Sequence, residues 1–302
     1  MNNPLVTVIT PSYNQGKFIE ETITSVLNQT YKNIEYIIID GASTDNTIEI
    51  IMRYSGSISK IVSKRDSGQS DAINKGISLA SGELITWVNS DDLLEAHAIE
   101  YAVSAFAEST SLDFVYGDVN LIDENSCHIR VLKGRQVKAP SVFYDLDLPI
   151  PQQGCMWRRH VTSSVGPLNT QWHYVLDREF FLRICLNNNV KYINQTLGSF
   201  RQHQQSKSVR MGESWIMELP AMYYALTKIP DWPFPQDDPI TKKIRASAHI
   251  HASYLALYAG KVRVGINNII LACKIYPTII FCGHIYLKPI NKIKTFLQDK
   301  IQ

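Results

Sequence analysis

The sequence has little cysteine and no long apolar run. Its five cysteines are widely spaced and form no CxxC pair, which argues against a disulfide framework and offers no zinc site. No stretch of 18 or more apolar residues occurs, so a transmembrane helix is not expected. The N-terminus lacks the basic and apolar regions of a signal peptide. These absences predict a cytoplasmic protein.

Charge of one sign is also lacking, although its distribution is uneven. The 302 residues contain 30 Lys+Arg and 28 Asp+Glu, a net charge of +2, which gives no reason to expect nucleic-acid binding. From Lys261 onward, however, seven basic residues stand against Asp299 alone: Lys261, Arg263, Lys274, Lys288, Lys292, Lys294 and Lys300. A basic, amphipathic segment predicts attachment to an anionic membrane surface. The alternative is a helical appendage with a solvated basic face.

Short apolar runs alternate with helical patterns over the first hundred residues. The predicted strands are Leu5–Thr10, Ile34–Ile39, Ile58–Ser63 and Glu83–Val88, and the predicted helices are Phe18–Asn28, Thr47–Tyr54 and Ala72–Ala80. The first strand is expected to end at the breaker Pro11. Continuous apolar strands alternating with helices predict an α/β fold whose parallel sheet is covered on both faces. Ligands of such sheets bind at the carboxyl ends of the strands.

The remaining chain is less regular. It predicts a strand at Phe114–Tyr116, a hairpin of Val119–Ile122 with Arg130–Leu132, and helices at Asp177–Leu186, Ile240–Ala259 and Val262–Ile275. Four prolines between Pro230 and Pro239 indicate a linker or strained loop. We expect a domain boundary near residue 210, which separates a domain of residues 1–210 from a helical region of residues 211–302.

Acidic residues follow two of the predicted strands. Asp91 and Asp92 come after the fourth strand, and Asp40 closes the second beside Gly41. Paired carboxylates repel each other, and Mg²⁺ or Mn²⁺ relieves this repulsion while it shares its remaining ligands with phosphate. The alternative is that the pair caps the next helix. Asp40 is placed to accept hydrogen bonds from a nucleobase or ribose. No GxGxxG or GxxxxGK[ST] motif occurs, which argues against a dinucleotide-binding crossover and a P-loop.

Five segments together resemble family 2 glycosyltransferases. They are residues 8–14 (VITPSYN), 23–31 (ITSVLNQTY), 37–45 (IIIDGASTD), 66–76 (DSGQSDAINKG) and 82–92 (GELITWVNSDD). They cover about the first hundred residues in order, and they are most similar to the O-antigen and exopolysaccharide branch. The resemblance implies a GT-A fold, which is a Rossmann-like, mostly parallel sheet with flanking helices. It also implies a nucleotide-sugar donor and inversion at the anomeric carbon.

The resemblance also assigns residues to the donor. Those implied for the nucleoside or sugar are Pro11, Tyr13, Asp40, Arg65, Asp66, Asn89 and Asp92. Asp91 is the implied ligand of Mn²⁺ or Mg²⁺, and Asp92 reaches the sugar or positions the loop. Asn89 stands where the family often has the first carboxylate of Asp-x-Asp, so it brings an amide without charge. The alternative for Arg65 is that it is a solvated surface residue with no contact to the donor.

The acceptor side is implied by three later segments. Inversion needs a base that deprotonates the acceptor hydroxyl, and Asp177 is the implied base with Glu179 as runner-up. Gln152 and Gln153 are expected to contact acceptor hydroxyls. His203 is expected as an additional metal ligand. The alternatives are that Asp177 caps a helix or pairs with a neighbouring Arg, and that His203 is structural.

The resulting hypothesis is an enzyme that moves one sugar from a UDP-hexose or UDP-N-acetylhexosamine to a lipid-linked glycan of O-antigen or other polysaccharide assembly. Residues 1–110 would form the nucleotide-sugar half and residues 111–210 the acceptor half. The enzyme is expected to lie peripherally at the inner face of the cytoplasmic membrane. Two alternatives stay open, namely a nucleotidyltransferase of sugar phosphates and a non-catalytic glycan-binding protein that retains the fold.

Overall fold

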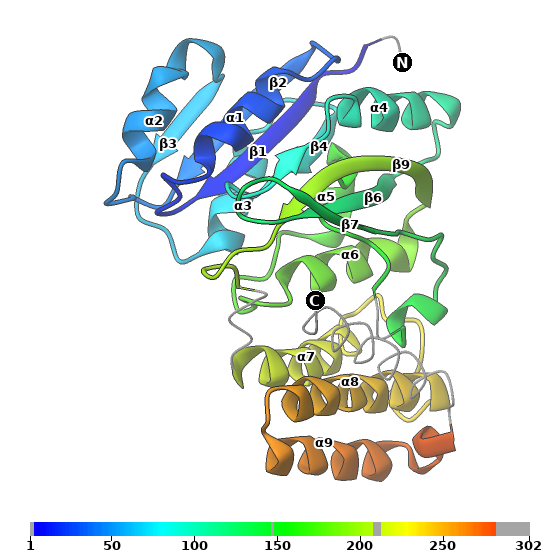
Figure 1. Ribbon diagram of the computed structural model, residues 1–302. Helices are drawn as coiled ribbons and strands as arrows, with labels where there is room; N and C mark the ends of the chain where they lie inside the picture. The colour runs from blue at the N-terminus through cyan, green and yellow to red at the C-terminus, as the bar shows by residue number, and fades with distance from the viewer. Residues whose placement is uncertain (1–2, 146–147, 208–212, 282–302) are drawn as a thin grey trace. The chain divides into compact units, whose positions relative to one another are not determined.

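The computed structural model describes residues 3–145, 148–207 and 213–281 (Figure 1). It divides into two compact units, one of Met1–Lys138 with Leu148–Arg210 and one of Ala139–Asp147 with Met211–Gln302. Residues 139–147 fall in the second unit, whereas the sequence predicted them as part of a domain of residues 1–210. The basic residues Lys288, Lys292, Lys294 and Lys300 lie outside the described residues, so their predicted role is not addressed by the fold.

The first unit is built on a mixed, nine-stranded sheet with the strand order β3-β2-β1-β4-β8-β6-β9-β5, and β7 pairs with β6. The strands are β1 (Val6–Ser12), β2 (Ile34–Asp40), β3 (Lys60–Ser63), β4 (Leu84–Trp87), β5 (Leu93–Leu94), β6 (Phe114–Ile122), β7 (His128–Leu132), β8 (Met156–Arg158) and β9 (Val190–Arg201). The part formed by β3, β2, β1 and β4 is parallel, as predicted. Beyond β4 the sheet is mixed, because β8 runs antiparallel to both β4 and β6.

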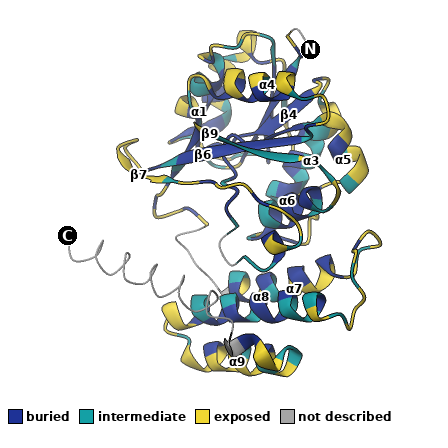
Figure 2. Cartoon of the chain, turned by 90° about the vertical axis from the view of Figure 1, so that its right-hand side faces the viewer, coloured by how far each residue is buried: buried dark blue, intermediate teal, exposed yellow. Residues whose placement is uncertain are grey.

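Helices cover the sheet of the first unit. They are α1 (Ile19–Leu27), α2 (Thr47–Arg53), α3 (Gln69–Leu79), α4 (Ala98–Glu108), α5 (Arg159–Val165) and α6 (Leu176–Asn187), with a 3₁₀ turn at Ser55–Ser57. Every residue of β1 and β4 is buried, and Figure 2 shows these strands in dark blue. The continuous apolar runs of the sequence therefore mark strands that are covered on both faces.

The prediction that the first strand ends at Pro11 is wrong. The strand continues to Ser12, with Pro11 opposite Ile39 and Ser12 opposite Asp40 of β2. Pro lacks a backbone N–H, but its fixed φ suits extended backbone and its carbonyl still accepts. The strand end therefore carries Ser12 directly to the edge where Asp40 lies.

Aromatic packing joins the two halves of the sheet. Trp87 on β4 stacks on Phe181 of α6 with ring centroids 5.5 Å apart, and it meets Trp157 of β8 edge-on at 5.5 Å. Phe180 contacts Trp157 at the same distance. All four side chains are buried. This cluster fixes α6, and with it Asp177, against the strand that leads into Asp91.

The second unit is helical. It contains a 3₁₀ turn (Ser141–Phe143), α7 (Glu213–Leu226), α8 (Pro239–Tyr258), α9 (Val262–Ile275) and a 3₁₀ segment (Pro277–Phe281). The proline-rich loop before α8 is ordered by Trp232, whose Nε1 donates to Thr241 Oγ1 at 2.9 Å and whose ring meets Phe143 edge-on. Within the described ranges, no helix combines the length and the apolarity that crossing a membrane requires.

The carboxylate of Glu35 joins three segments of the parallel half. Thr7 Oγ1 and the Ser81 backbone N–H donate to Glu35 Oε2 at 2.6 and 2.7 Å, while Ser81 Oγ and Lys60 Nζ donate to Oε1 at 2.9 and 3.2 Å. Burial acts to raise the pKa of Glu35, but these four donors outweigh it and lower the pKa from 4.5 to about 2. The ionised form of Glu35 therefore stabilises the fold.

We predict that Glu35→Gln lowers the free energy of unfolding by about 2 kcal/mol at pH 7, because an amide cannot accept all four hydrogen bonds. The folded-state pKa lies below the unfolded value, so this contribution is present above about pH 4.5 and is lost as the pH falls toward about 2. Urea unfolding of both proteins at pH 7 and pH 3 measures it. The exposed Glu49→Gln is the control, and a difference for Glu35→Gln that does not shrink at pH 3 contradicts the account.

Candidate active site

The loops that follow β1 and β2 are joined by hydrogen bonds at the carboxyl edge of the sheet. The backbone N–H of Asn14 donates to Ser43 Oγ at 2.8 Å, and that of Gly16 donates to Asp45 Oδ2 at 3.0 Å. Asn14 Oδ1 accepts in turn from the backbone N–H of Thr44 at 2.8 Å. Ser43, Thr44 and Asp45 thus bond the loop after β2 to the loop after β1. The two bonded loops form the edge of the sheet where a nucleotide would lie.

The residues predicted for the nucleoside lie along this edge with different exposure. Pro11 is buried within β1, whereas Tyr13 is 59% exposed and Arg65 is also exposed. Asp66 is half-buried, and its Oδ1 accepts from the backbone N–H of Gly68 at 2.9 Å. A Cβ atom at Gly41 would lie 2.9 Å from Asp66 Oδ2. Gly41 therefore permits the carboxylate of Asp66 to approach the loop after β2.

Asp40 is fully buried at the end of β2, and its carboxylate is occupied by neighbouring serines. Ser43 Oγ donates to Oδ1 at 2.5 Å, while the Ser43 backbone N–H and Ser63 Oγ donate to Oδ2 at 3.0 and 2.8 Å. In this structure Asp40 therefore holds the loop after β2 in place. Its predicted contact with a base or ribose stays a prediction.

Asn89, Asp92, Gln152 and Gln153 come together in one hydrogen-bonded cluster. Asn89 Nδ2 donates to Asp92 Oδ2 at 3.0 Å and to Gln152 Oε1 at 2.9 Å. Gln152 Nε2 donates to the carbonyl of Trp87, and Gln153 Nε2 donates to Asp92 Oδ2 at 2.8 Å. The loop expected to face the acceptor is thus bonded directly to the loop expected to face the diphosphate.

Asp92 is buried at the centre of this cluster. Burial and the neighbouring charge of Asp91 raise the pKa of Asp92 to about 8, while hydrogen bonds from Gln153, the Arg201 backbone and Asn89 act to lower it. Its oxygens accept every one of these bonds. In this structure the carboxyl group of Asp92 therefore holds neighbouring segments together, and both of its predicted roles stay predictions.

Asp91 lies at the opening of the same loop and meets His203. Asp91 Oδ2 is 3.0 Å from His203 Nε2. The His203 side chain is buried and packs against the Phe18 ring at a tilt of 46°, whereas 23% of the Asp91 side chain is exposed. A carboxylate oxygen and an imidazole nitrogen are donors that Mn²⁺ accepts. Among the described residues no group of three or more His, Cys, Asp or Glu could hold a metal, so diphosphate oxygens would have to complete the shell around this pair.

Asp177 and Glu179, the two candidate bases, differ in their surroundings. Burial raises the pKa of Asp177, and the backbone N–H of Arg178 donates to its Oδ1 at 2.7 Å. The charge of Arg178 and, more weakly, that of Lys207 act to lower this pKa without outweighing burial. Glu179 is buried in a two-point ion pair with Arg183, at 2.8 Å to Nε and 2.9 Å to Nη2. Glu179 thus holds α6, whereas Asp177 keeps an oxygen for another partner.

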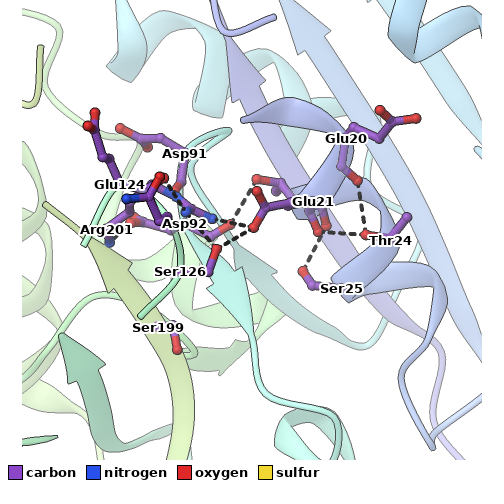
Figure 3. A network of polar contacts seen from close by, with 12 residues as sticks. Glu20, Glu21, Thr24, Ser25, Asp91, Asp92, Glu124, Ser126, Ser199 and Arg201 are labelled. Atoms are coloured by element: carbon purple, nitrogen blue, oxygen red, sulfur yellow. Dashed lines mark hydrogen bonds and ion pairs between the residues drawn. The ribbon is translucent and has the colours of Figure 1, made fainter. Parts of the chain in front are cut away.

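Arg201 is one of three residues at this site that were not predicted from the sequence. It ends β9, and its side chain has 0% exposure. Figure 3 shows it between the loop after β4 and α1. Its Nε donates to the Asp91 carbonyl at 2.8 Å, its Nη1 donates to Ser126 Oγ at 2.8 Å and to the Glu124 carbonyl at 3.3 Å, and its Nη2 donates to Glu21 Oε2 at 2.8 Å. One guanidinium thus joins three separate segments beside Asp91.

The backbone and neighbours of Arg201 extend this arrangement. Its backbone N–H donates to Asp92 Oδ1 at 2.9 Å. Its guanidinium lies 5.0 Å from the Phe18 ring centroid, and the same ring packs on His203. Both ligand candidates therefore depend on Arg201, Asp91 through its carbonyl and His203 through Phe18. No local pattern marks Arg201 for this role, because its partners Asp91 and Glu21 are 110 and 180 residues away in the sequence.

Gln69 and Lys207 were also missed. Gln69 Nε2 donates to Asn89 Oδ1 at 2.7 Å, and Lys207 Nζ donates to Gln69 Oε1 at 2.8 Å. Lys207 also donates to the His173 carbonyl at 3.3 Å. A chain of polar groups thus connects a cation to Asn89, the position where the sequence lacks a carboxylate.

The comparisons with known proteins agree on one family. The sequence model of the family described as Glycosyl transferase family 2 matches residues 7–161. The chain is 30% identical over 195 residues to UDP-Glc:alpha-D-GlcNAc-diphosphoundecaprenol beta-1,3-glucosyltransferase WfgD of Escherichia coli. The matched region covers 64% of this chain and 75% of that protein. The chain is also 25% identical over 232 residues to a PGL/p-HBAD biosynthesis glycosyltransferase of Mycobacterium tuberculosis, which covers 73% and 86%.

Solved structures agree on the fold. S. aureus TarS 1–349 in complex with UDP-GlcNAc has a TM-score of 0.63 at 14% identity and covers 89% of this chain and 90% of that chain. The mannosyltransferase PcManGT from Pyrobaculum calidifontis, in complex with GDP-Man and Mn²⁺, has a TM-score of 0.63 at 17% identity and covers 100% and 82%. The predicted GT-A fold with C-terminal helices is confirmed.

We predict that Arg201→Met lowers the free energy of unfolding by about 3 kcal/mol, because it removes a fully buried guanidinium whose hydrogen bonds join three segments of the first unit. Urea unfolding measures this loss. Glu21→Gln should cost less, since a neutral amide oxygen still accepts from Arg201 and half of the Glu21 side chain is exposed. Arg53→Met is the matched control, because Arg53 lies on the surface of α2 and pairs only within its own helix. Equal stability of Arg201→Met and Arg53→Met contradicts this reading of the network.

Proposed function

Because the chain belongs to glycosyl transferase family 2, we propose that this transferase moves one sugar from a UDP-sugar to a hydroxyl of a lipid-linked glycan, with inversion at the anomeric carbon. The observation that carries the proposal is the pair of Asp91 and His203 at the carboxyl edge of the sheet, 3.0 Å apart and fixed by buried Arg201. That edge is where a nucleotide diphosphate binds in open α/β sheets.

The donor is proposed to be a UDP-hexose or a UDP-N-acetylhexosamine. This choice is supported by the name of the E. coli relative, a UDP-Glc-dependent glucosyltransferase, and by the UDP-GlcNAc complex of TarS. Exposed Tyr13 directly follows β1, and half-buried Asp66 lies beside the loop after β2; both would contact the base and ribose, together with Arg65 and Asp40. Pro11, buried within β1, would lie beneath the nucleoside.

Asp91 and His203 would hold Mn²⁺ or Mg²⁺ together with the donor diphosphate. When it is bound, the metal offsets the negative charge that grows on the leaving UDP. A Mn²⁺-bound neighbour of the same fold, PcManGT, supports this assignment. Asn89 adds no charge, and Lys207 reaches it through Gln69, so this lysine would supply positive charge near the phosphates.

Asp177 is proposed to act as the general base. Its carboxyl group is half-buried on α6, with one oxygen anchored by the Arg178 backbone N–H. The carboxylate would take the proton of the acceptor hydroxyl as that oxygen attacks the anomeric carbon. Gln152 and Gln153 hold the neighbouring loop through Asn89 and Asp92, and we propose that they orient the acceptor there.

The acceptor is proposed to be a lipid-linked glycan of O-antigen, lipopolysaccharide or related polysaccharide assembly. The undecaprenol diphosphate acceptor in the name of the E. coli relative supports this class. The enzyme would then work peripherally at the inner face of the cytoplasmic membrane, with its basic C-terminal region toward anionic lipid. We retain the predicted division into a catalytic domain of residues 1–210 and a helical region of residues 211–302 as part of this proposal.

We predict that Asp177→Asn lowers kcat by about 10³-fold, because the base is lost, and leaves UDP affinity within about twofold. Glu179→Gln is the matched comparison: it weakens the ion pair with Arg183 and should lower stability while kcat changes little. Transfer of labelled sugar from UDP-sugars to extracted lipid-linked glycans measures kcat, and calorimetry with UDP and Mn²⁺ measures binding. Loss of kcat in Glu179→Gln alone would make Glu179 the base.

The pH dependence of kcat provides a second readout. Burial raises the pKa of Asp177 above its ordinary value of 3.8, and the base must be ionised to act. As the pH is lowered, the rate should therefore begin to fall while the pH is still above 3.8.

The same experiments test the two alternative functions. A binding protein without activity would show no turnover and equal glycan binding in both variants. A nucleotidyltransferase would instead release pyrophosphate from UTP and a sugar phosphate.

A further inference from the structure

Helix α9 presents a large aliphatic surface to solvent. Only two of its residues, Gly265 and Ala272, are buried, and both are small. A Cβ atom at Gly265 would lie 2.7 Å from the Leu257 side chain and 3.3 Å from the Ser253 carbonyl of α8. The helix therefore packs on α8 through its smallest residues and turns its large residues outward, which is the reverse of an ordinary amphipathic helix.

The exposed residues of α9 form what we call the α9 outer face. Its members are Val262 (56% exposed), Arg263, Val264, Ile266 (49%), Asn267, Ile269 (36%), Ile270 (47%), Leu271 (44%) and Lys274. Figure 2 shows α9 largely in yellow. Val262, Ile266 and Ile270 are spaced by four residues and form an aliphatic row that Lys274 continues, while Arg263, Asn267 and Leu271 form the adjacent row. Aliphatic and basic side chains thus share one exposed face, which marks an interaction surface.

The charge of this unit indicates which partner the face fits. Between Pro239 and Phe281 the sequence has six basic residues and no Asp or Glu: Lys242, Lys243, Arg245, Lys261, Arg263 and Lys274. A second copy of the chain paired through α9 would bring Arg263 and Lys274 against like charges. An anionic bilayer accepts both kinds of side chain, because its acyl region takes the aliphatic row and its phosphates take Arg263 and Lys274.

We propose that the α9 outer face lies in the headgroup boundary of an anionic bilayer, with Val262, Ile266 and Ile270 in the acyl region and Arg263 and Lys274 on lipid phosphates. The long stems of Arg and Lys allow their charges to stay at the phosphate level while the helix lies flat. This inference rests on the proposed function, since a lipid-linked acceptor brings the enzyme to the membrane. The membrane contact is thereby assigned to the residues of the α9 outer face.

Sedimentation of the full-length protein with vesicles tests the proposal. The vesicles are phosphatidylcholine alone or phosphatidylcholine with 30 mol% phosphatidylglycerol, a composition chosen to add about one negative charge for every three lipids. The double variant Ile266→Asn/Ile270→Asn removes the aliphatic row, and Arg263→Gln/Lys274→Gln removes the charge. Met217→Asn is the matched control, because Met217 is 71% exposed on α7 of the same unit. Circular dichroism and thermal unfolding check that each variant is folded.

We predict that wild-type protein binds the anionic vesicles at least tenfold more tightly than the neutral ones. Each double variant should lose at least tenfold of that affinity, and Met217→Asn should change it less than twofold. In Ile270→Trp, the fluorescence of the new side chain should shift to the blue with anionic vesicles. Unchanged binding in both double variants overturns the proposal. So does a wild-type dimer that Ile266→Asn/Ile270→Asn dissociates while vesicle binding persists.

Binding of UDP with Mn²⁺, measured on the same proteins by thermal shift, separates this inference from the proposed function. Wild-type protein that binds UDP but no vesicles contradicts the α9 inference alone. Protein that binds anionic vesicles through α9 but no nucleotide contradicts the proposed donor and leaves the surface assignment intact. In the α9 variants the thermal shift with UDP should equal that of wild type.

Discussion

The buried guanidinium of Arg201 is the interaction on which the site depends. It lies where the end of β9, the loop after β4, the β6–β7 turn and α1 meet, and it donates to the last three of them. A charge with 0% exposure is costly unless each of its donors finds an acceptor. Because the acceptors come from separate segments, the cost is offset only when all of them are correctly placed. Folding of the unit and positioning of Asp91 are therefore one event.

The site combines few charges with many neutral amides. Asn89, Gln152, Gln153 and Gln69 form a continuous hydrogen-bonded chain around the buried carboxylate of Asp92. Amides both donate and accept, so such a chain keeps its geometry without the repulsion of a second ionised carboxylate. In the loop after β4, the carboxylate that remains partly exposed is that of Asp91, beside His203. The proposed metal site therefore depends on one carboxylate of this loop.

The sequence predicted the parallel half of the fold well because its strands are covered on both faces, and burial of both faces requires continuous apolar runs. It predicted β9 poorly, since Val190–Arg201 carries Asn, Gln and Thr and half of its residues are only partly buried. Arg201 could not be found from local pattern, because its partners Asp91 and Glu21 are 110 and 180 residues away and meet it only through the pairing of β9. Asp91 and His203 were predicted as ligands by resemblance, and their side chains meet. The sequence predicted a basic, amphipathic segment from Lys261 onward, but it did not show which side of α9 is exposed, because aliphatic spacing on a helix usually indicates a buried face.

The central claim of this account is that Asp91 and His203 are the protein ligands of the metal that accompanies the nucleotide diphosphate. Anomalous diffraction at the manganese edge, from crystals grown with UDP and Mn²⁺, tests it most directly. The account predicts one strong anomalous peak in contact with the Asp91 carboxylate, the His203 imidazole and the diphosphate of UDP. UDP bound at the carboxyl edge with no anomalous peak beside Asp91, or a manganese ion held by other residues, would contradict it.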